Sequence, residues 1–319
     1  MGGAAAVCAT VVVAAGVAAW AWRRSRMVRV LRFVAARARA RRADGVLAGA
    51  EPIALDRSAT HAVLLLHGFG DTPQSVAALA THLADGHGWT VRAPLLPGHG
   101  RTLADFAASD ADQWLAHAVA AHDALTATHD HVAIVGLSMG GALATLVAAR
   151  AGARCPALVL LAPYLTPPPA ARRLARLAPA AQALVPWLAP ARDGSPSIRD
   201  AEALAANLGY GTASPRLVRE LVRIADRAVA AAPSVRAPVC LVHGTSDYRV
   251  PAALARTHPA CFGGAARVEL HWIDDTGHVL TVDRQRARVF ALTAAWLGAV
   301  PGAPAPAPPG AGAPTPPAR

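Results

Sequence analysis

The sequence predicts an α/β domain with a mostly parallel sheet, helices on both faces and a small helical cap. Strand-like and helix-like segments alternate along the chain, which is the pattern of parallel strands joined by helices. Several strand-like segments, such as VLLL and LVLLA, are apolar throughout, as strands buried on both faces require. A stretch of roughly seventy residues, 163–233, interrupts this rhythm and is too long for a plain connection, so we interpret it as the cap.

Size and charge fit one domain of this kind. The chain has 319 residues, 54% of them hydrophobic, so it can bury a sizeable core. A net charge of +11 would suggest a nucleic-acid partner. However, residues 23–42 contain nine arginines, and without them the net charge falls to +2. Because the excess is local and lies beside an apolar segment, we expect no nucleic-acid partner.

The cysteines do not indicate a metal site. None of the four has a CxxC or other metal-type spacing, and we expect them to be small buried hydrophobes, with disulfide status left open. They are Cys8, Cys155, Cys240 and Cys261. We therefore expect no metal site at the cysteines, and the nucleophilic chemistry described below requires neither a metal nor an organic cofactor.

The N-terminal residues 1–22 are predicted to be a transmembrane anchor. Residues 4–22 carry no charge and would span about 28 Å as a helix, close to the thickness of a bilayer core. Trp20 and Trp22 followed by arginines fit a membrane interface. Residues 23–45 would then form a basic juxtamembrane linker.

The positive-inside rule extends this prediction to localisation. Because the arginines follow the apolar segment, the folded domain, 46–299, is expected to be membrane-anchored and to lie in the cytoplasm. A start at Met27 would remove the segment and leave a soluble cytoplasmic protein. The Pro/Ala-rich tail, 300–319, is expected to be disordered because it cannot bury a core.

The predicted elements of the domain follow from these patterns. Strand-like runs predict strands at His61–Leu66, Thr90–Ala93, Val132–Val135, Ala157–Leu161, Val239–Val242 and Arg267–Ile273. Longer runs of helical pattern predict helices at Gln74–Asp85, Ala111–Thr128, Gly141–Ala151, Val250–Cys261 and Arg284–Leu297.

A Gly-x-Ser-x-Gly motif lies between a predicted strand and a predicted helix. Ser138 stands between Gly136 and Gly140 in VAIVGLSMGGALA. This context predicts a sharp strand-to-helix turn that presents the hydroxyl as a nucleophile. The glycines allow close backbone approach at a strained turn, and the helix N-terminus favours negative charge.

A second loop is placed to stabilise a negatively charged oxygen. The strand His61–Leu66 ends in the sequence HGFG, 67–70. We expect this loop to point the N–H of Phe69 at the space above the serine, where it would form an oxyanion hole with the N–H of Met139. His67 precedes the nucleophile, and we expect it to be structural.

Two later loops supply an acid and a base. Asp247 and His278 each follow the end of a predicted strand, as Ser138 does, so all three lie where open α/β sheets place their sites. His278 would take the serine proton and Asp247 would orient the imidazole. Asp274 and Asp275 are alternatives for the acid, but they lie so close to His278 that we expect them to shape its turn.

These segments resemble those of a known superfamily. The matching pieces are LLLHGFGDTPQS, APLLPGHGRT, VAIVGLSMGGALA, HGTSDYRVP and DDTGHVLTVD. Over about residues 55–298 the sequence resembles the α/β-hydrolase superfamily and, within it, the bacterial carboxylesterase and monoacylglycerol lipase group. The resemblance implies the α/β-hydrolase fold, with a small helical cap over the nucleophile.

The resemblance also implies an activity. It assigns the nucleophile to Ser138, the acid to Asp247 and the base to His278, with Phe69 and Met139 as oxyanion donors. It implies a serine hydrolase that cleaves short- or medium-chain acyl esters or monoacylglycerols through an acyl-enzyme. The expected partners are a small ester or lipid substrate and, through the N-terminal segment, a membrane.

Other functions remain open. An acyltransferase, a thioesterase or a peptidase would use the same three residues. A membrane-tethered, non-catalytic binding protein is a further alternative. Asp71 departs from the group, which often has a small residue there, and leaves the substrate side of its loop open. His99, in the GHG turn, is expected to be structural.

Overall fold

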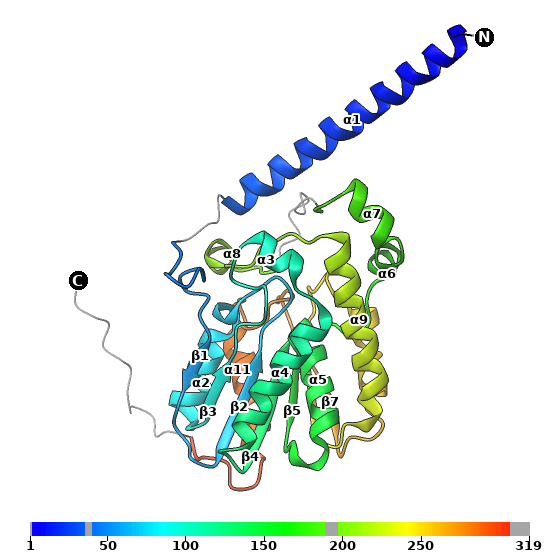
Figure 1. Ribbon diagram of the computed structural model, residues 1–319. Helices are drawn as coiled ribbons and strands as arrows, with labels where there is room; N and C mark the ends of the chain where they lie inside the picture. The colour runs from blue at the N-terminus through cyan, green and yellow to red at the C-terminus, as the bar shows by residue number, and fades with distance from the viewer. Residues whose placement is uncertain (1, 36–39, 189–196, 307–319) are drawn as a thin grey trace.

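The computed structural model describes residues 2–35, 40–188 and 197–306, and a seven-stranded sheet forms its centre (Figure 1). The strand order is β1-β3-β2-β4-β5-β6-β7, with β1 antiparallel to β3 and every other neighbouring pair parallel. The strands are β1 (Ile53–Leu55), β2 (His61–Leu66), β3 (Thr90–Ala93), β4 (His131–Leu137), β5 (Leu158–Leu161), β6 (Val239–Gly244) and β7 (Val268–Ile273). This confirms the predicted mostly parallel α/β architecture.

Helices cover both faces of the sheet (Figure 1). One face packs against α4 (Ala111–Thr126), α5 (Met139–Ala151) and α9 (Pro215–Ala231), and the other against α2 (Ala77–His87) and α11 (Arg286–Gly298). Successive side chains of a strand point to opposite faces, so Leu64 joins the first core and Leu65 the second. This explains why the central strands are apolar at nearly every position.

One predicted helix is shorter in the structure. The segment predicted as a single helix, 250–261, contains α10 (Ala252–Ala255) and a separate 3₁₀ turn, His258–Cys261. Pro259 lacks the N–H that a continuous helix needs. The sequence analysis did not predict β1 or α3 (Leu103–Ala108).

The stretch predicted as a cap contains several short helices between β5 and β6. These are α6 (Pro169–Arg176), α7 (Ala178–Leu184) and α8 (Ala201–Ala206). They lie at one end of the sheet, whereas α9, which follows them, runs along the face and packs against α5 (Figure 1). We propose that α6, α7 and α8 form the cap; its residues 189–196 lie outside the described part of the chain.

The N-terminal helix α1 (Gly2–Ala35) contains the predicted membrane anchor. The side chains of residues 1–10, 12, 13 and 15, a large part of that anchor, are outside the described portion. Among the residues that are described, no helix combines the length and apolar character needed to cross a bilayer. The structure therefore does not support the predicted transmembrane anchor, membrane association or membrane localisation.

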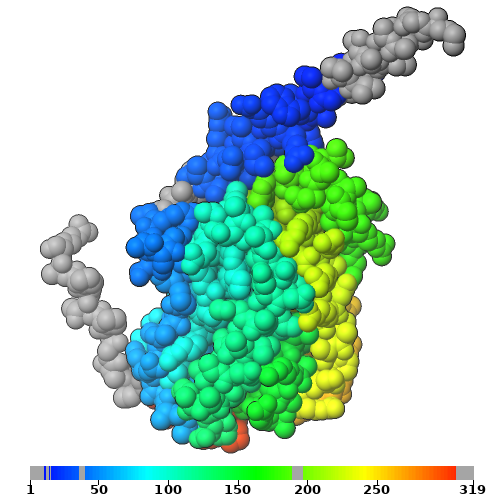
Figure 2. Space-filling view, in the orientation of Figure 1, coloured from blue at the N-terminus to red at the C-terminus, as the bar shows by residue number. Residues whose placement is uncertain are grey.

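The arginine-rich half of α1 packs on the domain instead. Val30 is fully buried, and Met27 and Val34 contact the same core. Their spacing places them on one side of a helix, and most of the arginines of α1 are exposed. Arg23 donates a hydrogen bond to the carbonyl of Ala183 in α7 at 2.5 Å. Figure 2 shows this blue segment lying across the top of the domain, next to the green surface of the cap.

Segments at both margins of the domain also contact it. Leu47, within a short loop that follows α1, is buried and donates its N–H to Gly100 O at 2.8 Å. At the other end, the Pro301 carbonyl lies 3.0 Å from His61 Nε2. Most of the predicted disordered tail, 307–319, lies outside the described residues.

Candidate active site

Ser138 occupies a strained turn between β4 and α5. Its backbone has φ 55° and ψ −116°, a conformation that side-chain-bearing residues rarely adopt. Its N–H donates to Leu161 O at 2.9 Å. A Cβ on Gly136 would lie 2.2 Å from Gly140 O, and one on Gly140 would lie 2.2 Å from Leu66 O. The motif glycines therefore permit the close backbone packing that this turn requires.

His278 lies between Ser138 and Asp247. Its Nε2 is 2.7 Å from Ser138 Oγ, and its Nδ1 is 2.7 Å from Asp247 Oδ2. Ser138 follows β4, Asp247 follows β6 and His278 follows β7. All three are largely buried. The structure thus brings together the three residues that the sequence predicted as base, nucleophile and acid.

The surroundings of Asp247 favour its ionised form. Burial by itself would raise the pKa of Asp247, but attraction to His278, the hydrogen bond from that ring and the N–H of Val250 together lower the pKa below its usual value. Asp247 Oδ1 accepts the N–H groups of Arg249 at 2.8 Å and Val250 at 3.0 Å. These bonds leave Oδ2 directed at the imidazole.

The alternative acids do not contact the imidazole. Asp275 is exposed and forms ion pairs with Arg199 at 2.8 Å and Arg284 at 2.9 Å. Its φ of 49° places it in the turn before His278. Asp274 is exposed as well. Both aspartates belong to the turn, as their spacing suggested.

The two expected oxyanion donors flank the serine. Met139 is the first residue of α5 and directly follows Ser138. The loop that carries Phe69 lies close by, because a Cβ on Gly68 would be 3.4 Å from Ser138 Cβ. In the described part of the chain, neither the Phe69 nor the Met139 N–H has a hydrogen-bond acceptor. Both N–H groups are therefore available to a ligand oxygen.

The two histidines expected to be structural are fully buried, and neither ring forms a hydrogen bond with Ser138. Leu96 N–H donates to His67 Nε2 at 3.1 Å, and His67 Nδ1 lies 2.9 Å from Gly68 O. Burial holds the pKa of His67 well below its usual value and lowers the pKa of His99 to about 4. Both rings are neutral near pH 7, and they pack against each other beneath the oxyanion loop.

Comparison with known proteins identifies the family. The family model described as serine aminopeptidase, S33, matches residues 57–285. The chain belongs to this hydrolase family. The seven-stranded sheet and the solved structures below confirm the α/β-hydrolase fold.

Individual relatives place the hydrolase among lipases and esterases. A thermostable monoacylglycerol lipase from Bacillus sp. (strain H-257) is 37% identical over 103 residues, which are 32% of this chain and 40% of that protein. A solved structure from work on the metagenome-derived lipolytic enzymes LipS and LipT is 31% identical, with a TM-score of 0.69, and the match covers 78% of this chain and 98% of that one. The monoacylglycerol lipase of Paleococcus ferrophilus shares the fold at 19% identity and a TM-score of 0.65, over 77% of this chain and 96% of that one.

These findings confirm the resemblance to the carboxylesterase and monoacylglycerol lipase group. They also support the predicted enzyme class, a carboxylic ester hydrolase. The curated lipase aligns over less than half of its own length, and the structure with the higher identity aligns over nearly all of its chain.

The structure places Asp71 where the oxyanion loop meets the segment that follows α8. Asp71 is almost fully buried, and its Oδ1 accepts the N–H of Thr72 at 2.9 Å and lies 3.5 Å from the Asn207 amide nitrogen. A shorter hydrogen bond joins the same two segments, because Tyr210 N–H donates to Gly70 O at 2.8 Å. Asp71 therefore faces a neighbouring segment of the chain that sequence spacing could not reveal.

Burial makes Asp71 a source of pH-dependent stability. Burial raises the pKa of Asp71, opposed by Ser75, Thr72 and Asn207. Folding therefore favours the protonated acid, and stability is lost as the pH rises from about 4 through the raised folded-state pKa. We expect Asp71→Asn to increase the melting temperature relative to wild type more at pH 7 than at pH 4, measured by scanning calorimetry.

Asp105→Asn provides a control of opposite sign. Hydrogen bonds from Thr102 lower the pKa of Asp105, so this exposed carboxylate stabilises the fold above about pH 4. Its substitution should lower the melting temperature more at pH 7 than in acid. If Asp71→Asn behaved like Asp105→Asn, the argument from burial would be wrong.

A carboxylate that the sequence analysis did not single out also touches the base loop. Asp283 is fully buried, and its Oδ2 accepts the N–H of Gly277 at 2.7 Å. Its position at the end of DDTGHVLTVD is the only sequence signal, and that stretch alone does not show which way the side chain turns.

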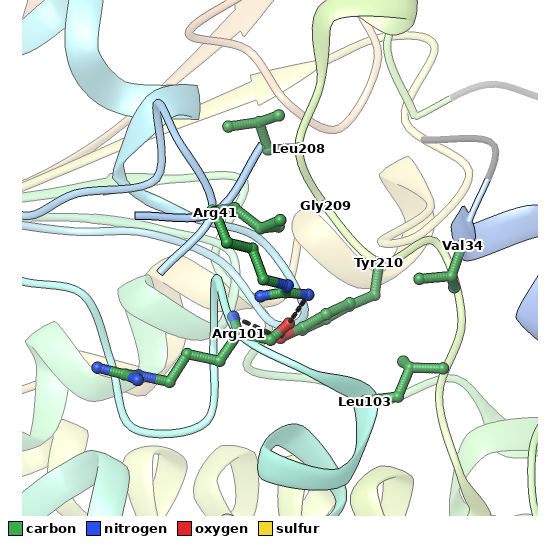
Figure 3. A pocket seen from close by; sticks show the side chains of 8 residues that line it. Val34, Arg41, Arg101, Leu103, Leu208, Gly209 and Tyr210 are labelled. Atoms are coloured by element: carbon green, nitrogen blue, oxygen red, sulfur yellow. Dashed lines mark hydrogen bonds between the residues drawn. The ribbon is translucent and has the colours of Figure 1, made fainter. Parts of the chain in front are cut away.

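Figure 3 shows a small cavity beside Tyr210 and Arg101. It is lined by Val34, Arg41, Leu47, Arg101, Leu103, Leu208, Gly209 and Tyr210. The Tyr210 hydroxyl accepts the Arg101 N–H at 3.0 Å, and Arg101 O lies 2.8 Å from the same hydroxyl. At about 40 Å³ the cavity is far smaller than the 300 Å³ or more usual for ligand pockets, and no member of the triad lines it.

Proposed function

We propose that this hydrolase cleaves carboxylic esters through a serine nucleophile and an acyl-enzyme. The proposal depends on one observation above all, the position of the His278 ring at 2.7 Å from both Ser138 Oγ and Asp247 Oδ2. This arrangement gives a weakly acidic hydroxyl a base and gives that base an orienting carboxylate.

The geometry supports an ordinary sequence of acyl transfer. His278 Nε2 takes the proton of Ser138 as Oγ attacks the ester carbonyl, and the N–H groups of Phe69 and Met139 receive the negatively charged oxygen. The protonated ring then gives its proton to the leaving alcohol. A water molecule, deprotonated by His278, hydrolyses the acyl-enzyme and restores the serine. Asp247 stabilises the charged imidazole in both halves of the cycle.

The proposed substrates are short- or medium-chain acyl esters, including monoacylglycerols. The similarity to a monoacylglycerol lipase and to a structure of lipolytic enzymes supports this class. The proposed cap lies over the same end of the sheet as the triad, and Trp187 is one of its buried apolar residues. Residues of this kind would accommodate an acyl chain.

Amide hydrolysis is the second candidate, because the description of the family names a serine aminopeptidase. An ester and an amide pass through the same tetrahedral intermediate and differ in the leaving group. The triad geometry supports both reactions. The relatives that act on lipids favour the ester.

A substrate panel separates these functions. We expect the purified protein to hydrolyse p-nitrophenyl acyl esters and 1-monoacylglycerols with a kcat/KM at least about 100-fold above that for an aminoacyl p-nitroanilide or an acyl thioester, a gap of about 2.7 kcal/mol in activation free energy. A fluorophosphonate should label one serine per chain, Ser138. Preference for the anilide would assign a peptidase, and an absence of labelling would indicate a non-catalytic binding protein.

A further inference from the structure

Asp283 accepts four backbone hydrogen bonds although it is fully buried. Its Oδ1 accepts the N–H groups of Arg199 at 3.0 Å, Asp200 at 2.9 Å and Arg284 at 2.9 Å. Its Oδ2 accepts the N–H of Gly277 at 2.7 Å. A carboxylate removed from water needs hydrogen bonds in place of its hydration, and these four donors supply them. The side chain thereby joins three separate stretches of the chain.

The neighbouring arginine side chains are directed to a different carboxylate. Arg199 Nε and Arg284 Nη1 donate to Asp275 at 2.8 Å and 2.9 Å, at a half-exposed position. Asp275 and Asp283 therefore bind the same two residues in different ways. Asp275 accepts hydrogen bonds from their guanidinium groups, and Asp283 accepts hydrogen bonds from their backbone N–H groups.

The backbone N–H groups of both residues beside His278 are tied to this junction. Gly277 N–H, on one side, donates to Asp283 Oδ2, and Val279 N–H, on the other, donates to Ser197 O at 3.0 Å. A Cβ on Gly277 would lie 2.7 Å from Ser197 O, so only glycine permits this approach. The backbone that carries the imidazole is thus held from both sides.

The same junction connects the cap with the acid loop. Ser197 Oγ accepts a hydrogen bond from Arg249 Nε at 3.0 Å, two residues beyond Asp247. Asp200 caps the N-terminus of α8 by accepting the N–H of Ala203 at 2.9 Å. The segment 197–200, which lies within the proposed cap just before α8, therefore contacts the loop of the base and the loop of the acid.

We propose that Asp283 is a positioning residue that holds the His278 loop against the segment 197–200 and so sets the distances from the imidazole to Ser138 and Asp247. The inference rests on the proposed function, because it assigns Asp283 a part in the turnover that the triad performs. The imidazole must accept and return protons at Nε2 without losing its Nδ1 bond. A displacement of about 1 Å at such a centre costs on the order of 100-fold in rate.

Asp283→Asn tests this role with little change in shape. The asparagine oxygen can still accept three of the N–H groups, but its NH₂ group would face the N–H of Gly277, donor against donor. We expect kcat per active site to fall by on the order of 10-fold to 100-fold, with KM changed by less than about threefold. Active sites are counted by titration to completion with a fluorophosphonate. The low-field NMR resonance of the His278 Nδ1 proton, shared with Asp247, should shift or disappear.

Asp275→Asn is the matched control. It removes the same charge from the same loop and with it the ion pairs to Arg199 and Arg284. Asparagine also tolerates the positive φ of that residue. We expect its kcat to stay within about twofold of wild type, since surface ion pairs contribute little. An Asp283→Asn protein with a lower melting temperature but unchanged kcat per titrated site and an unchanged proton resonance would overturn the proposal. If the wild type hydrolysed no ester, the proposed function alone would fail, because the resonance and the phosphonate labelling rate test the positioning role without an ester.

Discussion

Ser138→Ala is expected to abolish ester hydrolysis, lowering kcat by a factor on the order of 10⁴ to 10⁶. Without Oγ, the imidazole 2.7 Å away has no proton to accept and no acyl-enzyme can form. The remaining rate would come from the oxyanion donors and substrate binding. The measurement is steady-state hydrolysis of a p-nitrophenyl ester by the purified variant, together with loss of fluorophosphonate labelling.

The fold should survive this substitution. Alanine removes one oxygen and no apolar contact, and it meets the same backbone strain at φ 55°. Ser109→Ala is a suitable control, since Ser109 is also buried but its hydroxyl donates to Phe106 O, at 2.8 Å. That variant should retain wild-type turnover. If Ser138→Ala kept more than about a tenth of wild-type kcat while folded, the nucleophile would have to be reassigned.

Asp247→Asn is expected to lower kcat by a factor on the order of 10⁴. The asparagine oxygen can still accept the N–H groups of Arg249 and Val250, so its NH₂ group would face His278 Nδ1. That nitrogen would then have to accept a hydrogen bond, which puts the ring proton on Nε2, facing Ser138. In this tautomer the imidazole cannot take the serine proton.

The pH dependence and a neighbouring variant make this prediction specific. At high pH, hydroxide can take over part of the role of the base, so we expect the deficit of Asp247→Asn to shrink as the pH rises. Asp274→Asn changes an exposed carboxylate near His278 and should leave kcat within about twofold of wild type. Normal turnover in Asp247→Asn with a large loss in Asp274→Asn would move the role of the acid to Asp274.

Local patterns were sufficient for much of the fold and for the residues at the site. The strands β2, β4, β5 and β6 are apolar at nearly every position because both faces of a parallel sheet are covered. Ser138 was recognisable because a strand, a turn and a helix follow one another within a short stretch. Asp247 and His278 were recognisable because parallel strands end at the same edge, so loops distant in sequence converge there.

Other features depend on contacts between distant segments. β1 has three residues and exists as a strand because it pairs with β3, which its composition does not signal. The apolar segment near the N-terminus suggested a membrane anchor, and the same helix continues into a half that packs Val30 against the domain. An apolar face indicates burial, but only the tertiary structure shows what covers it.

The sequence by itself therefore determined the parallel α/β sheet and the identity of the candidate triad, because these follow from short-range periodicity and from strand order. The tertiary structure alone decided the orientation and partners of Asp71 and Asp283. Asp283 reaches the N–H groups of Arg199 and Asp200, more than eighty positions earlier in the chain. Which backbone groups a buried carboxylate meets depends on how folded segments cross in space, and no local pattern encodes that crossing.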